Sequence, residues 1–124
     1  MSIAESAPAN SARILVFAGG LCGAAGVALS AASAHLGGAF VGTAASFLIM
    51  HAPVFLAVGL SGTNRTLRIG SLVLLVGLVL FCGDLACRDF LGQRLFAMAA
   101  PTGGTVLMGG WLLIGIASLW RARA

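Results

Sequence analysis

The chain has 124 residues, of which 60% are hydrophobic and only 8% are charged. Soluble domains carry roughly 25% charged residues, and small ones leave much of their surface in water, so this composition excludes an ordinary soluble fold. The net charge of +4 comes from seven basic residues, all arginines, which lie between long apolar runs. A nucleic-acid-binding face would gather such charges among polar residues, so this class of function is excluded as well.

Four apolar segments follow a short amino-terminal tail. Residues 1–12 are rich in Ser, Ala and Asn and lack periodicity, which predicts a flexible or surface-lying tail. A helix needs about 17–25 residues to cross the hydrocarbon core of a membrane, and strands of a membrane barrel are shorter and alternate. The sequence therefore predicts an all-α membrane protein, a bundle of four transmembrane helices with spans at about 14–34, 40–60, 69–86 and 102–120.

The first apolar segment has a second interpretation. Arg13 before it and Ala32-Ser33-Ala34 near its end imitate a secretory signal peptide with an A-x-A cleavage site. The apolar run is longer than the about 7–15 residues typical of such a signal. We interpret the segment as a retained helix and keep the cleaved signal as the alternative.

Arginines at the ends of the segments predict the orientation of the bundle. With four spans, the two termini and the second loop lie on one side, and that side carries five of the seven arginines. The positive-inside rule places this side in the cytoplasm, where the arginines also touch lipid headgroups. These five residues are Arg13, Arg65, Arg68, Arg121 and Arg123.

The third connection, residues 87–101, is predicted to be an outer interfacial segment. It holds several Phe and Leu side chains beside the polar Arg88, Gln93 and Arg94. An amphipathic segment lying on the outer surface of the membrane would bury the apolar side chains and keep the polar ones in water. Pro101 lacks a backbone N–H and has a fixed φ, which favours the first turn of the fourth helix.

Glycines inside the apolar segments predict close packing of the helices. In lipid, small residues let helix backbones approach, and many short van der Waals contacts then provide the attraction. The first segment contains Gly19-x-x-x-Gly23, and a small-residue face begins there. Its further members are Gly20, Ala24, Ala28 and Ala31. The predicted packing glycines are Gly19, Gly23, Gly70, Gly77, Gly103, Gly104 and Gly110.

Three ionisable side chains, His35, His51 and Asp84, lie within the apolar segments or at their ends, where such residues usually face protein. In one interpretation, His51 serves a backbone carbonyl near the helix-kinking Pro53, and Asp84 pairs with Arg88 four residues later. In the other, the three side chains form a polar cluster beside Arg88. We also expect Asp84 to face the bundle near the start of the fourth helix, away from lipid.

Other chemistry is sparse in the sequence. Cys22, Cys82 and Cys87 are interpreted as free thiols, and a disulfide between the last two requires the third helix to end between them. The sequence contains no C-x-x-C or M-x-x-M pair, phosphate loop or Ser/His/Asp spacing. We therefore expect no metal site, no cofactor and no enzyme.

Several short motifs resemble those of a known family, in the same order. Ala34-His35-Leu36 is similar to its G-A-F-G-A-H element, and Met50-His51-Ala52 to its Y-H-A element. Residues 81–85 are similar to F-S-G-S-L, residues 101–104 to T-P-I-G-G, and Gly110-Trp111 to G-W. The chain thus resembles the transmembrane protein 256 family, also catalogued as domain of unknown function 423, from about Arg13 to Trp120. It departs from the family pattern at Ser30, Ala32, Ser33 and Asp84.

The resemblance implies a four-helix protein of the bacterial inner membrane and no assigned activity. With many packing faces and little chemistry, the first hypothesis is a non-enzymatic protein that acts by helix–helix contact, as an accessory or structural subunit of a membrane complex. Its partners would be membrane lipids and other membrane subunits or a second copy. The second hypothesis is a small transporter, or a proton- or metal-handling protein, that uses His35, His51 and Asp84.

Overall fold

The structure is a computed structural model, and the part of the chain that it describes is residues 10–61 and 64–119. It contains four helices, and each is long and apolar enough to cross a membrane. They are α1 (Asn10–Leu36), α2 (Ala39–Ser61), α3 (Arg65–Phe90) and α4 (Ala99–Ala117). The predicted set of four apolar helices is therefore confirmed, although each helix differs from its predicted span at one or both ends.

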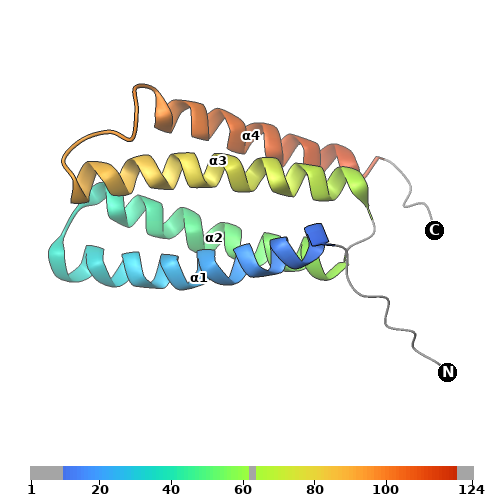
Figure 1. The fold of residues 1–124 in the computed structure, drawn as a ribbon, viewed down its shortest axis with the longest axis horizontal. Helices are drawn as coiled ribbons and strands as arrows, with labels where there is room; N and C mark the ends of the chain where they lie inside the picture. Colours follow the sequence, from blue (N-terminus) through green and yellow to red (C-terminus); the bar gives the residue numbers. More distant parts are fainter. Residues whose placement is uncertain (1–9, 62–63, 120–124) are drawn as a thin grey trace.

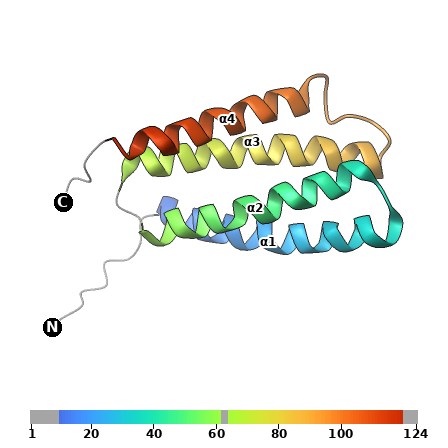
Figure 2. The same ribbon diagram turned by 180° about the vertical axis from the view of Figure 1, so that it is seen from behind.

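The helices lie side by side with alternating direction, so that α1 begins and α4 ends at the same end of the bundle (Figures 1 and 2). The closest packing is between α1 and α2 and between α3 and α4, and α2 packs against α3. Within the described residues, the backbone of α4 approaches neither α1 nor α2. The fold is thus two helical hairpins joined along α2 and α3.

The first hairpin is closed by two glycines, and the start of α3 is fixed by an asparagine. Gly37 and Gly38 have φ values of +78° and +106°, a region that residues with a Cβ rarely adopt. Asn64 caps α3, because its Oδ1 accepts a hydrogen bond from the backbone N–H of Leu67 at 3.2 Å. Its side-chain amide also donates to the carbonyl of Ala117, which ties the start of α3 to the end of α4.

Two predicted boundaries need correction. The tail was predicted to run to residue 12, but α1 already begins at Asn10, and residues 1–9 lie outside the described part of the chain. The outer interfacial segment was predicted over 87–101, but α3 continues to Phe90 and only residues 91–98 connect it to α4. The first glycine beyond residue 83 is Gly92, at φ +70°, and α3 ends just before it.

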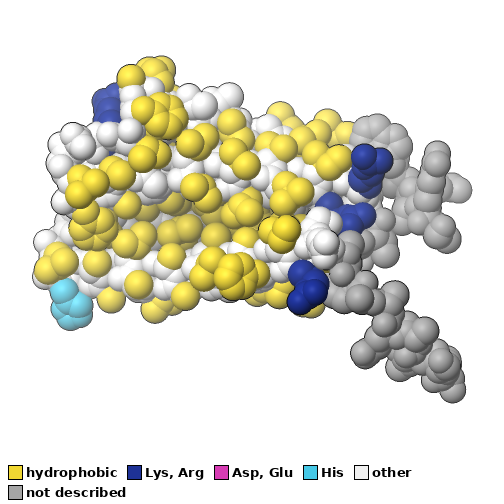
Figure 3. Space-filling view, viewed as in Figure 1, with side chains coloured by type: hydrophobic (Ala, Val, Ile, Leu, Met, Phe, Trp, Pro, Cys, Tyr) yellow, Lys and Arg dark blue, Asp and Glu magenta, His cyan; other side chains and the backbone are white. Residues whose placement is uncertain are grey.

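Apolar side chains cover both the inside and the outside of the bundle. Phe55, Leu15 and Leu74 are fully buried, whereas Phe17 and Leu112 are 68% and 67% exposed. Figure 3 shows hydrophobic side chains (yellow) along the whole length of one face, and basic side chains (dark blue) only toward its two ends. A helix bundle that is apolar all round suits a lipid environment. The fold is that of a multi-pass membrane protein.

Most of the predicted packing glycines lie against another helix. A methyl group at Gly77 would come within 2.6 Å of the backbone nitrogen of Leu107, and one at Gly103 within 2.6 Å of that of Phe81. A methyl group at Gly19, Gly70 or Gly110 would also lie close to the neighbouring helix, at 2.8–3.1 Å from its nearest atom.

Two of the predicted glycines are not closely packed within the described residues: a methyl group at Gly104 would meet nothing within 4 Å, and the nearest neighbour of one at Gly23 would lie 3.9 Å away. The prediction also missed Gly26 and Gly59, which lie tightly between α1 and α2.

Candidate functional site

The three predicted polar residues occupy separate places. His35 is exposed at the end of α1, His51 is buried within α2, and Asp84 is fully buried near the end of α3. Among the described residues, no hydrogen bond or ion pair joins any two of them. The described residues therefore do not bring His35, His51 and Asp84 together as the second interpretation expected, and each of the two buried side chains has partners of its own.

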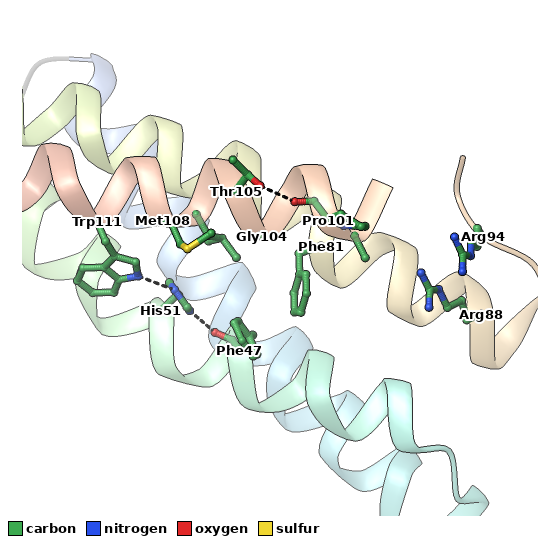
Figure 4. Close-up of a pocket in the computed structure, with 12 residues that line it drawn as sticks. Phe47, His51, Phe81, Arg88, Arg94, Pro101, Gly104, Thr105, Met108 and Trp111 are labelled. Carbon is green, nitrogen blue, oxygen red and sulfur yellow. Dashed lines mark hydrogen bonds between the residues drawn. The ribbon is translucent and has the colours of Figure 1, made fainter. Parts of the chain in front are cut away.

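His51 links α2 to α4 across the two hairpins. The indole N–H of Trp111 on α4 donates to His51 Nε2 at 3.2 Å, and Nδ1 lies 2.7 Å from the carbonyl oxygen of Phe47 (Figure 4). Because an indole nitrogen only donates, Nε2 is the acceptor, and Nδ1 carries the proton that it donates to Phe47. These two hydrogen bonds correspond to the tautomer with the proton on Nδ1, and the imidazole lies between the rings of Phe47 and Trp111.

This arrangement refines the interpretation of His51. The histidine does bind a backbone carbonyl, and that carbonyl belongs to Phe47, one helical turn before His51. The carbonyl of Ile49, which lacks its helical partner because of Pro53, is not the one bound. The sequence analysis did not identify Trp111 as a partner of His51. The only signal available was the position of a tryptophan inside an apolar helix, where its N–H needs an acceptor.

Asp84 fixes the connection between α3 and α4. Its Oδ2 accepts from Arg88 Nη2 at 2.8 Å and from Nε at 3.0 Å, so the predicted ion pair is present. Its Oδ1 accepts from the backbone N–H of Leu95 at 2.8 Å. Asp84 therefore faces the segment that leads into α4, as expected in direction, but it binds that segment and not the helix start at Pro101. Both carboxylate oxygens have structural partners.

The neighbouring carboxylate joins the ends of α2 and α3. Asp89 Oδ2 accepts from the backbone N–H of Val41 at 2.7 Å, which satisfies one donor in the first turn of α2. The guanidinium carbon of Arg88 lies 5.2 Å from the ring centre of Phe40, also in that turn. These contacts anchor the end of α3 to the start of α2.

A groove of about 700 Å³ lies beside these residues, between α2 and α4 with α3 as its base. Its walls are largely apolar and include Phe47, Phe81, Met108 and Trp111. Figure 4 shows the hydrogen-bonded pair of His51 and Trp111 at one end of the groove and Arg88 with Arg94 at the other. Gly104 lines the groove, which explains the open space beside it.

The opposite end of the bundle holds the arginines that predict topology. Arg13 and Arg65 are exposed near the starts of α1 and α3, and Arg68 donates to the hydroxyl of Ser11 at 3.0 Å. Arg121 and Arg123 lie outside the described residues. The described arginines of this group therefore lie at one end of the bundle, and Arg88 and Arg94 lie at the other.

The cysteines and metal-ligating side chains are dispersed. Cys22, Cys82 and Cys87 are free thiols, and the last two lie within one continuous helix, where their side chains diverge. In residues 10–61 and 64–119, no three His, Cys, Asp or Glu side chains gather closely enough to hold a metal ion.

One comparison with known proteins gives a match. The model of a family described as "Protein of unknown function (DUF423)" matches residues 20–104, which run from α1 to the beginning of α4. The matched range includes His35, His51 and Asp84 but ends before Trp111. The chain matches no curated protein and no solved structure.

Proposed function

The chain belongs to the DUF423 family of unknown function, and from this premise we propose that it acts by helix–helix contact, as an accessory or structural subunit of a membrane complex. The proposed role is non-enzymatic, because the polar atoms of His51 and the carboxylate oxygens of Asp84 are occupied by structural partners. The partners are membrane lipids and either other membrane subunits or a second copy of the chain.

The observation that carries this proposal is a second small-residue face on α1. One face of this helix, including Gly19 and Gly26, packs against α2. Gly20, Ala24, Ala28 and Ala31 lie on a different face and are exposed, and a methyl group at Gly20 would meet nothing within 4 Å. In lipid, a row of small residues at this spacing allows another helix to approach closely. Within residues 10–61 and 64–119, no helix packs closely on this face, so it is available to a helix from outside the chain.

The proposal is tested by filling this face. Ala24→Leu with Ala28→Leu places large side chains along the row, and Ala57→Leu at an exposed position on α2 is the matched control. After purification in mild detergent, we expect a complex with wild type and the control and its loss with the double variant. Purification of wild type as a monomer with no partner contradicts the proposal, as does a complex that survives the double variant.

The transporter hypothesis would need His35, His51 and Asp84 to share one path for an ion. No contact among the described residues favours it, since His35 is exposed and the other two have separate partners. We therefore do not propose it as a second function.

The proposed location is the bacterial inner membrane, with both termini in the cytoplasm. Its support is the collection of arginines at the end where α1 and α3 begin. Alkaline phosphatase is active only outside the cytoplasm, so we expect inactive fusions after Gly62 and Ala124 and an active fusion after Ala97. An active fusion at Ala124 would instead support an odd number of spans and a cleaved first segment.

A further inference from the structure

We infer that the groove between α2 and α4 is a binding site for an anionic phospholipid, with one acyl chain in the groove and the phosphate at Arg88 and Arg94. This site is independent of the small-residue face on α1, which lies on the helix farthest from α4. The inference needs only that the four apolar helices cross a membrane.

The length of the groove matches one leaflet of a bilayer. Along α4 the lining runs from Ala100 to Trp111, which is eleven steps along the helix, or about 16 Å at ~1.5 Å per residue. The hydrocarbon core of a membrane is about 30 Å thick, so this length is about half of it. The hydrogen bond between His51 and Trp111 closes the groove at its deep end. An acyl chain that enters from the end of the bundle would therefore stop near the middle of the bilayer.

The walls of the groove fit a flexible hydrocarbon chain. Phe47, Phe81 and Met108 supply apolar surface, and Gly104 leaves room between the helices. Both ring nitrogens of His51 already have hydrogen-bond partners, the carbonyl of Phe47 and the indole of Trp111, so they offer no free donor to a headgroup there. A cavity of about 700 Å³ lies in the size range of ligand pockets.

The charge at the open end selects a negative headgroup. Among the described residues that line the groove, the charged ones are both arginines, Arg88 and Arg94. Arg88 uses Nε and Nη2 to bind Asp84, which leaves the N–H groups of Nη1 for another acceptor. Arg94 is exposed, and it forms no ion pair or hydrogen bond within the described part of the chain.

Asp84 and Asp89 do not cancel this selectivity. Asp84 is fully buried and neutralises one arginine, whereas Asp89 binds the start of α2 and does not line the groove. One positive charge thus stays uncompensated at the mouth. Arginine suits a phosphate, because its planar guanidinium forms two parallel hydrogen bonds to phosphate oxygens. Basic pockets between transmembrane helices bind anionic headgroups by the same chemistry.

The experiment uses the full chain, purified in mild detergent and given equal amounts of phosphatidylglycerol and phosphatidylcholine, with bound lipid counted by native mass spectrometry. We expect one retained phospholipid per chain and a preference for phosphatidylglycerol. Arg94→Gln should lower that preference about tenfold, the effect of ~1.4 kcal/mol in one charge-assisted contact. Arg65→Gln, an exposed arginine at the other end of the bundle, should leave it unchanged.

A second pair of variants tests the acyl chain separately. Gly104→Leu fills the groove from a position with no neighbour within 4 Å, and should abolish retention of both lipids. Gly109→Leu is the matched control, because it also has open space on α4 but does not line the groove. Unchanged melting temperatures of both variants establish that they fold.

Three results would overturn the site: retained lipid in folded Gly104→Leu, equal binding of both lipids by wild type, or an undiminished preference in Arg94→Gln. A neutral isoprenoid lipid that co-purifies in place of a phospholipid would also overturn it, since such a molecule has no use for the arginines.

Discussion

The two helical hairpins are closed by different physical means. The connection between α1 and α2 consists of Gly37 and Gly38, which adopt backbone angles that only glycine accepts easily. The connection between α3 and α4 covers residues 91–98 and is held by a carboxylate inside α3, eleven residues away from the N–H that it binds. The short turn therefore depends on local backbone chemistry, and the long one depends on a buried polar contact.

The largest expected effect is at Asp84, on which the long connection depends. Asp84→Ala leaves the guanidinium of Arg88 and the N–H of Leu95 without their acceptor. Removing one partner of a buried ion pair costs about 3–5 kcal/mol, and the side chain of Arg88 stays 21% exposed, so we expect about 3 kcal/mol. The measurement is the free energy of unfolding in mild detergent.

Asp84→Asn separates the two contributions of the carboxylate. The amide oxygen still accepts from Leu95, so we expect a smaller loss of unfolding free energy than in Asp84→Ala. We also expect proteolysis within residues 91–98 to be slower than in Asp84→Ala. Equal stability of the two variants would mean that Leu95 gains nothing from its acceptor.

The next effect distinguishes the helix interface from the connections. Gly103→Ala puts a methyl group 2.6 Å from the backbone nitrogen of Phe81, and backbone atoms there cannot turn aside as a side chain does. Overpacking of this kind costs about 1–3 kcal/mol, so we expect about 2 kcal/mol from unfolding experiments.

Gly104→Ala is the neighbouring control for this variant. Its methyl group meets open space in the groove, and alanine favours helix by up to ~1 kcal/mol over glycine. We expect unchanged or slightly higher stability. If Gly104→Ala lost as much unfolding free energy as Gly103→Ala, close packing would not explain why glycine is needed on α4.

Effects of a similar or smaller size are expected in the short turn. Gly37→Ala should cost about 1 kcal/mol, because a residue with a Cβ is strained at positive φ and the space around it is open. Gly38→Ala should cost more, about 2 kcal/mol, because its methyl group would also lie 2.6 Å from Asp89 Oδ2, which binds Val41. Equal melting temperatures for the two variants would show that Asp89 yields without loss.

The difference between the hairpins also explains what the sequence predicts well. Four apolar runs of this length predict helices in lipid, and the positive φ values in the short turn are ones that Gly37 and Gly38 adopt without help from distant residues. The ion pair of Asp84 and Arg88 was predictable from helical spacing for the same reason. Each of these features depends on residues that are close together in the chain.

Features that depend on distant residues were not predictable. Gly104 lines a groove because α4 is separated from α2, and no local sequence pattern predicts this separation. The pairing of His51 with Trp111 joins residues 60 positions apart. The alternative cluster with His35 does not form among the described residues, because depth along a helix predicts a level in the membrane but not a direction around the helix axis.

The smallest expected effect concerns the contact that joins the two hairpins across the groove. Trp111→Phe removes the indole N–H but keeps an aromatic ring, and His51→Phe removes Nε2 but keeps a ring beside Phe47. Hydrogen bonds between transmembrane helices average about 0.6 kcal/mol in double-mutant cycles, because the unfolded chain in the membrane finds other partners. The cycle of wild type, two single variants and the double variant isolates this pair from the bond between His51 and Phe47, which His51→Phe also removes. We expect a coupling free energy near 0.6 kcal/mol. A value of zero would mean that α2 and α3 alone hold the hairpins together, and that the closed end of the groove opens freely.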